Sequence, residues 1–215
     1  MKIGICDTGL SYRPSNVIEV RNFTNSNRFD TDDYLGHGTH ITNIISNLAS
    51  DVDIYVAKTL DKRKGSMNYL YEGIRWLVFD CHVDTINCSF GSISADVHLR
   101  DLMKVCEMFG VTIVCSAGNN PNQTIYPSSY DFSNIISVGS IDKDGNVTDW
   151  SSRNCDIYTL GVDINAQVGE NEWKKLSGTS QSSAIITGVL ASLDGNKEEL
   201  FKKTVDKKLL INEWS

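Results

Sequence analysis

The other motifs of this sequence are organised around LSGTSQSSAIITG, which runs from Leu176 to Gly188. Its glycine and threonine predict a tight turn, and the small and branched apolar residues that follow predict a buried helix. Ser180 then lies in the first turn of that helix, where unpaired N–H groups and the helix dipole stabilise negative charge. Such a serine is either an N-capping residue or a nucleophile. The stretch alone leaves both roles open.

Two other segments favour the nucleophile. KIGICDTG, from Lys2 to Gly9, predicts an apolar strand that ends in an acid and a glycine. GHGTH, from Gly36 to His40, places a histidine between two glycines at the start of a second helical pattern. A nucleophilic serine needs a base to accept its proton, and the base needs an acid that holds its tautomer and stabilises its cation. Asp7, His37 and Ser180 supply these groups.

In this order and with these neighbours, the segments resemble those of the subtilisin-like serine proteases, the subtilases. Further matching segments are SAGN at 116–119, INCSFG at 86–91, YPSSY at 126–130 and IISVGS at 135–140. The resemblance therefore extends from about Lys2 to about Leu193. One departure is that Ala184 and Ile185 stand where the family usually has proline and histidine. Neither position makes or breaks a bond, so we expect altered packing there and not a loss of activity.

The resemblance implies a serine endopeptidase with Asp7, His37 and Ser180 as its catalytic triad. It also implies that the Asn119 side chain donates a hydrogen bond to the oxyanion. His40, the second histidine of its motif, is expected to be a packed helix residue and not the base.

The substrate-binding residues implied by the resemblance belong to four segments: an edge that pairs with an extended peptide, two walls of a specificity pocket, and the base of that pocket. They are Gly65 and Ser66 at the edge, Ser89, Phe90, Gly91, Ser116, Ala117 and Gly118 in the walls, and Ile125 at the base. These segments hold no acidic residue to pair with lysine or arginine, and a branched base shortens the pocket. We therefore expect cleavage after small or medium uncharged residues.

The order of apolar runs predicts an α/β fold with a mostly parallel sheet and helices on both faces, a three-layer arrangement like that of subtilisin. Strands are expected at 2–7, 17–23, 53–60, 84–88 and 111–115, and helices at 70–79, 97–109 and 197–205, besides those that follow His37 and Ser180. With 215 residues, the chain is expected to form a single peptidase domain over 1–215. Active residues then gather at the carboxyl ends of the strands.

Composition narrows the partners and the compartment. A net charge of −7 argues against nucleic acid as the main partner, and no apolar run reaches membrane-spanning length. Met1 leads directly into a predicted strand, without the pattern of an export signal. The six cysteines include no C-x-x-C pair and are expected to be reduced core residues. These observations predict a cytoplasmic enzyme. The resemblance implies a peptide or protein substrate, with room for a dedicated substrate or an inhibitory partner on a separate chain.

No cofactor or metal is expected. The acids Asp30, Asp32 and Asp33 lack the alternating ligands of a calcium loop and are expected to form a solvated face. The connection at 49–52 is also too short for the calcium loop that many subtilases carry before the next strand.

Two alternatives follow from the same sequence. The chain could be a catalytically silent subtilase fold that binds peptides or a partner, although no triad or oxyanion residue is missing. The triplet Asp7-Thr8-Gly9 could also be an aspartic-protease signature. That mechanism needs two carboxylates that share a proton, so a chain with one such motif would have to dimerise, and the histidine and serine motifs would remain unexplained.

Overall fold

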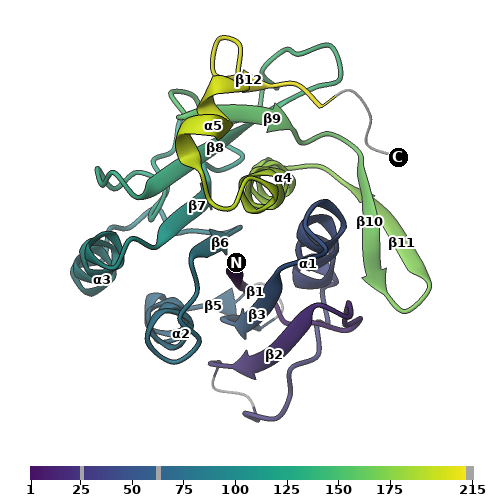
Figure 1. Cartoon of the computed structure of the whole chain (residues 1–215), viewed down its shortest axis with the longest axis vertical. Coiled ribbons are helices and arrows are strands. Elements are labelled where there is room, and N and C mark those ends of the chain that lie inside the picture. The colour runs from purple at the N-terminus through teal and green to yellow at the C-terminus, as the bar shows by residue number, and fades with distance from the viewer. Residues whose placement is uncertain (25–26, 62–63, 212–215) are drawn as a thin grey trace.

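The computed structural model describes residues 1–24, 27–61 and 64–211. In this part the chain builds a central sheet of eight strands whose neighbours all run parallel, in the order β12-β9-β8-β7-β6-β1-β3-β2 (Figure 1). The strands of this sheet are β1 (Lys2–Asp7), β2 (Val17–Asn22), β3 (Asp53–Lys58), β6 (Thr85–Cys88), β7 (Thr112–Ser116), β8 (Ile135–Ile141), β9 (Ile157–Leu160) and β12 (Lys208–Leu209).

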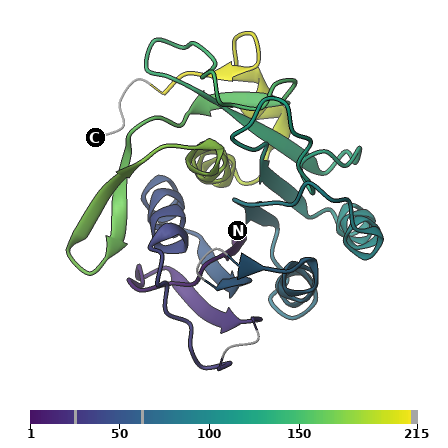
Figure 2. The same cartoon turned by 180° about the vertical axis from the view of Figure 1, so that it is seen from behind.

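Helices cover both faces of the sheet (Figures 1 and 2). One face carries α1 and α4, and the other carries α2 and α3. The helices are α1 (His37–Leu48), α2 (Met67–Phe79), α3 (Val97–Met108), α4 (Thr179–Ser192) and the short α5 (Lys197–Lys202). The predicted three-layer α/β fold is thus confirmed. None of the described helices is long and apolar enough to cross a membrane.

The residues of β1 alternate between the two helix-covered faces of the sheet. Ile3 and Ile5 pack into the core beneath α1 and α4, whereas Cys6 packs into the core beneath α2 and α3. Gly4 also faces α2, because a Cβ at this position would lie 2.8 Å from Cδ1 of Leu77. Both faces of the strand are therefore buried, as is typical of a parallel sheet covered on both sides.

Two antiparallel hairpins are added to this framework. β4 (Leu60–Asp61) pairs with β5 (Lys64–Gly65) directly after β3, and β10 (Ile164–Gly169) pairs with β11 (Glu172–Leu176) directly before α4. Figure 1 shows the β10–β11 hairpin beside α1. The sequence analysis did not predict either hairpin.

Element boundaries differ from the sequence prediction by a few residues, for local reasons. α2 begins at Met67 and not near Leu70, because the Ser66 side chain accepts a hydrogen bond from the Tyr69 N–H and caps the helix. α3 ends as expected before Gly110, whose φ of +72° suits a glycine just past a helix end. α5 ends at Lys202 and not near Val205, where the chain turns into the last strand.

The contact between α1 and α4 depends on a glycine. A Cβ at Gly188 would lie 2.6 Å from Cβ of Leu48, which is closer than real side chains approach. The α4 residues Ala184 and Ile185 are fully buried in the same core cluster as Ile41 and Ile45 of α1, so the two helices share one tightly filled interface. Gly188 lets the end of α1 and the second half of α4 approach closely.

The six cysteines are buried and free, as expected for reduced core residues. Three of them, Cys6, Cys88 and Cys115, lie in register on the neighbouring strands β1, β6 and β7. Burial raises the pKa of the Cys106 thiol to about 12 and that of Cys155 to about 11, so these thiols stay protonated near neutral pH.

Replacing Gly188 with alanine is expected to destabilise the protein. Overpacking against Leu48 costs about 1 to 3 kcal/mol, which exceeds the roughly 1 kcal/mol that alanine gains over glycine in a helix. Urea unfolding of Gly188→Ala measures the loss. In a Leu48→Gly background the Cβ, Cγ and Cδ1 atoms that the new methyl group would meet are gone, so the same substitution should be neutral or stabilising. A gain in stability in the unmodified protein would show that this interface is not tightly packed.

His40 ties α1 to the β10–β11 hairpin and is fully buried. Its Nε2 lies 3.0 Å from the Ile164 carbonyl oxygen and 3.1 Å from that of Lys174, so Nε2 carries the proton and donates. Its Nδ1 is buried and has no hydrogen-bond partner in the described part of the chain. His40 is thus a packed helix residue, as the sequence analysis expected. Burial lowers the pKa of His40, because the charged form would lose its hydration.

This lowered pKa predicts a pH-dependent stability. The unfolded chain binds the proton below about pH 6.5, while folded His40 resists it, so stability should fall as the pH decreases through 6.5 and below. The variant His40→Gln cannot titrate, so its melting temperature should fall less between pH 7.5 and pH 5, even if it is lower throughout. The matched control His98→Gln alters an exposed histidine on α3 and should keep the wild-type slope. Parallel curves for wild type and His40→Gln would contradict the prediction.

Candidate active site

Asp7 and His37 meet where β1 ends and α1 begins. The buried Asp7 Oδ1 lies 2.7 Å from His37 Nδ1, and it also accepts a hydrogen bond of 2.8 Å from the Thr8 N–H. A carboxylate on Nδ1 fixes the tautomer of a neutral imidazole, with the proton on Nδ1 and a lone pair on Nε2. The His37 side chain is 23% exposed, so solvent or a ligand can reach the ring.

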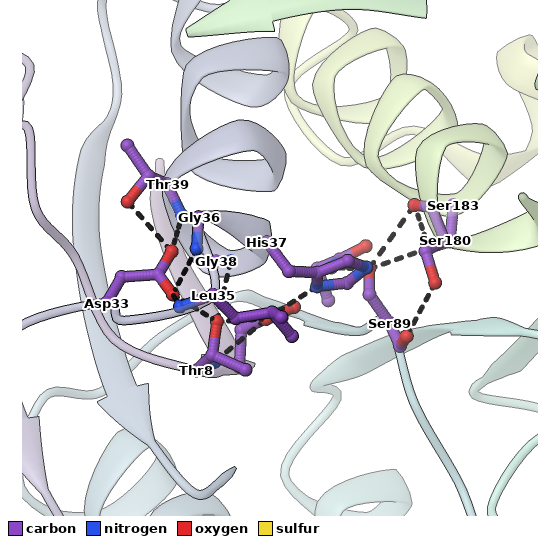
Figure 3. Close-up of polar contacts among 12 residues, drawn as sticks. Thr8, Asp33, Leu35, Gly36, His37, Gly38, Thr39, Ser89, Ser180 and Ser183 are labelled. Carbon is purple, nitrogen blue, oxygen red and sulfur yellow. Dashed lines mark hydrogen bonds and ion pairs between the residues drawn. The ribbon is translucent and has the colours of Figure 1, made fainter. Parts of the chain in front are cut away.

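Ser180 lies in the first turn of α4, directly after the buried Gly178–Thr179 turn. Figure 3 shows the His37 ring pointing from the start of α1 towards Ser180. The Ser180 hydroxyl donates a hydrogen bond of 2.7 Å to the main-chain carbonyl oxygen of Ser89. The structure therefore brings the acid, the histidine and the serine of three distant motifs to one edge of the sheet.

Asn119 lies against the turn that leads into α4. Its Oδ1 accepts hydrogen bonds from the Thr179 N–H at 2.9 Å and the Thr179 hydroxyl at 3.0 Å. Because the oxygen is held in this way, the amide NH₂ faces the other side, where Nδ2 lies 3.2 Å from the position that a Cβ at Gly178 would take. A side chain at Gly178 would thus crowd the Asn119 amide. The arrangement leaves an amide donor beside the first turn of α4.

Ile125 lies between the two segments expected to form pocket walls. A Cβ at Gly91 would lie 2.5 Å from Ile125 Cγ2, and one at Gly118 would lie 2.7 Å from Ile125 Cγ1. The segments are also joined by main-chain hydrogen bonds in both directions between Ser92 and Tyr126. Any side chain at either glycine would collide with Ile125, so these residues form one contiguous group.

A groove of about 590 Å³ runs beside this group and includes six of the predicted site residues. These are the predicted base His37 and the predicted substrate-binding residues Gly65, Ser66, Ser89, Phe90 and Gly91. The groove is completed by residues that the sequence analysis did not assign to the substrate site, which are Thr8, Leu35, Leu60, Met67 and Ser92. Ser116 and Ala117 are buried at the carboxyl end of β7 and do not line it; Ala117 instead lines a separate polar depression of about 430 Å³.

One residue of the acidic loop differs from its expected role. Asp33 is 5% exposed and hydrogen-bonded within the protein, so the prediction that it belongs to a solvated face was wrong. Asp32 is exposed as predicted. The N-cap of α1 is Gly36, so Asp33, three residues earlier, is not at a capping position that the sequence analysis could have used. In the described ranges no three His, Cys, Asp or Glu side chains come together as a metal site would require.

Comparison with known proteins agrees with this geometry. The model of the subtilase family matches residues 1–213. The chain is 28% identical over 224 residues to the Major intracellular serine protease of Bacillus subtilis (strain 168), covering 94% of this chain and 69% of that protein. It is 29% identical over 210 residues to Subtilisin DY of Bacillus licheniformis, covering 89% and 75% of the two proteins. A match that spans nearly the whole chain establishes that it belongs to the subtilase family.

Proposed function

We propose that this chain is a serine endopeptidase and that residues 1–215 form one peptidase domain. The observation that carries the proposal is the 2.7 Å contact between Asp7 and His37, at the same edge of the sheet where α4 presents Ser180. An acid, a base and a hydroxyl in this arrangement supply the groups that acyl transfer requires.

In the proposed reaction, His37 Nε2 accepts the Ser180 proton as Oγ attacks the scissile carbonyl. Asp7 holds the ring and stabilises the imidazolium that forms. His37 then returns the proton to the leaving amine, and water hydrolyses the acyl-enzyme by the same steps.

Ser180 must first turn away from the Ser89 carbonyl oxygen, which accepts its proton in the free protein. An extended substrate lying along the segment at Ser89–Gly91 would offer a main-chain N–H to that carbonyl, as added strands do. Substrate binding would thereby release the hydroxyl towards His37.

The Asn119 amide and the Ser180 N–H are proposed to bind the oxyanion of the tetrahedral intermediate. Asn119 is pre-oriented by its two hydrogen bonds from Thr179, so little reorganisation is needed as charge develops. The N-terminal end of α4 adds a favourable dipole.

The proposed substrates are peptides or proteins cut after small or medium uncharged residues. Two observations support this: Ile125 fills the space between Gly91 and Gly118, and none of the described residues that line the groove is acidic. A cytoplasmic location is proposed from the sequence and from the printed names of two relatives, the Major intracellular serine protease and the Intracellular serine protease of Paenibacillus polymyxa. A dedicated partner on a separate chain fits the same proposal.

Ser180→Ala and His37→Ala are each expected to lower kcat/KM by about 10⁴-fold or more, and the double variant should be little worse, because the triad acts as a unit. Digestion of a random peptide library, with the products identified by mass spectrometry, measures the loss. Ser192→Ala, an exposed serine on the same helix, is the matched control and should cut normally. Unimpaired cleavage by Ser180→Ala, or labelling of a different serine by an organophosphate, would overturn the proposal.

Ile125→Gly is expected to change specificity. Removing the branched side chain between Gly91 and Gly118 should deepen the pocket, and each additional buried CH₂ of a larger substrate side chain is worth about 0.8 kcal/mol. The variant should therefore gain activity after phenylalanine or tyrosine relative to alanine or valine in the same library. Wild-type cleavage dominated by arginine or lysine would contradict the proposed pocket.

A further inference from the structure

Asp33 is a buried acid whose two oxygens accept five hydrogen bonds (Figure 3). Oδ1 accepts from the Thr8 hydroxyl at 2.8 Å, the Leu35 N–H at 3.1 Å and the Gly36 N–H at 2.8 Å. Oδ2 accepts from the N–H and the hydroxyl of Thr39, at 2.8 and 2.9 Å. Five donors around one carboxylate satisfy a negative charge without water.

These donors flank both members of the acid–histidine pair. Thr8 directly follows Asp7, Gly36 directly precedes His37, and Thr39 lies two residues after it. The Gly38 N–H also donates to the Thr8 hydroxyl oxygen, at 2.9 Å. Asp33 thus contacts the chain on both sides of the pair.

The Thr8 hydroxyl has a single proton and two carboxylates within reach. Its oxygen lies 2.8 Å from Asp33 Oδ1 and 3.2 Å from Asp7 Oδ1. A hydroxyl donates one hydrogen bond, and 2.8 Å is close to the preferred O–H···O distance whereas 3.2 Å is beyond it. The proton therefore lies on the Asp33 side, and Asp7 Oδ1 keeps the Thr8 N–H and the His37 Nδ1–H as its donors.

We propose that Asp33 is a positioning residue for the triad: it holds the Thr8 hydroxyl proton away from Asp7, so that Asp7 interacts more strongly with His37. The proposal rests on the proposed peptidase function for its kinetic consequences. Its structural content, which carboxylate accepts the Thr8 proton, can be tested without turnover.

The substitution Asp33→Asn should change which side chain accepts the Thr8 hydroxyl proton, while the side chain at position 33 keeps almost the same shape. An amide is a weaker acceptor than a carboxylate, so the Thr8 hydroxyl should turn to Asp7. With a further donor on Asp7 and the negative charge of Asp33 removed, the His37 imidazolium is less stabilised. His37 should then lose its proton at lower pH.

Two further titratable side chains lie close to His37 on the described elements β1 and α1. Asp7 contacts the ring from β1, and His40 lies one turn further along α1 and is held neutral by burial near pH 7. Helix α4, from Thr179 to Ser192, carries no ionisable side chain other than its serine and threonine hydroxyls. A shift in His37 titration that occurs in Asp33→Asn and not in Asp32→Asn can be assigned to Asp33 and Thr8, because both variants keep these other groups.

The first experiment records kcat/KM against pH for the wild type, Asp33→Asn and the control Asp32→Asn, which removes the same charge from the exposed neighbour. The acid limb of Asp33→Asn should move to lower pH by about half a pH unit or more, while Asp32→Asn should keep the wild-type limb. If the acid limb of Asp33→Asn is unchanged and turnover falls equally at every pH, Asp33 only stabilises the loop, and the proposal is overturned.

The second experiment needs no turnover. The proton between Asp7 and His37 gives a far-downfield ¹H NMR signal, whose position and pH midpoint report the strength of this contact. Both should change in Asp33→Asn and not in Asp32→Asn. If the wild type shows this behaviour but cleaves no peptide, the proposed function fails and the role of Asp33 stands.

Thr8→Val keeps the test decisive if Asp33→Asn does not fold, because it leaves the main-chain partners of Asp33 in place. If the hydroxyl proton belongs to Asp33, its removal leaves the NMR midpoint of His37 unchanged, whatever the effect on turnover. If the proton belongs to Asp7, its removal raises that midpoint, and the proposal is wrong. In a Thr8→Val background, Asp33→Asn should shift the NMR midpoint of His37 by less, because no Thr8 hydroxyl is left to turn to Asp7.

Discussion

The close contact between α1 and α4 is the constraint on which the site depends. His37 opens one helix and Ser180 lies in the first turn of the other, so their distance follows from how the two helices pack. Gly188 permits that packing, because any side chain there meets Leu48. The residues that bring the reactive groups together thus lie well away from them, in a core of apolar side chains that carry no chemistry of their own.

Much of this architecture could be predicted from the sequence because its signals are local. Apolar strands alternating with helices indicate a parallel sheet, and Asp7 directly follows such a strand while His37 and Ser180 begin helices. Parallel order alone then directs these three groups to one edge of the sheet. The boundaries were less certain, since α2 begins earlier than its apolar pattern because Ser66 caps it.

The features that escaped prediction depend on contacts between distant residues. Asp33 lies in a stretch of polar residues and was interpreted as solvated, yet its partner Thr8 is 25 positions away and can be found only in the folded chain. The same holds for Leu35, Leu60 and Met67, which line the groove because the β4–β5 hairpin and the loop before α1 meet there. A buried acid with five internal donors resembles a surface acid in sequence, and only the fold distinguishes them.

The buried thiols have a practical consequence for following how the molecule opens. Cys6, Cys88 and Cys115 lie on adjacent central strands with no exposed surface, so a thiol-modifying reagent can reach them only when the sheet separates. Cys81, just past the end of α2, and Cys155, just before β9, lie nearer the periphery and can be uncovered by smaller openings. The native thiols can therefore report both local and global unfolding without an introduced label. Their modification rates would distinguish local opening at the edges of the sheet from opening of its centre.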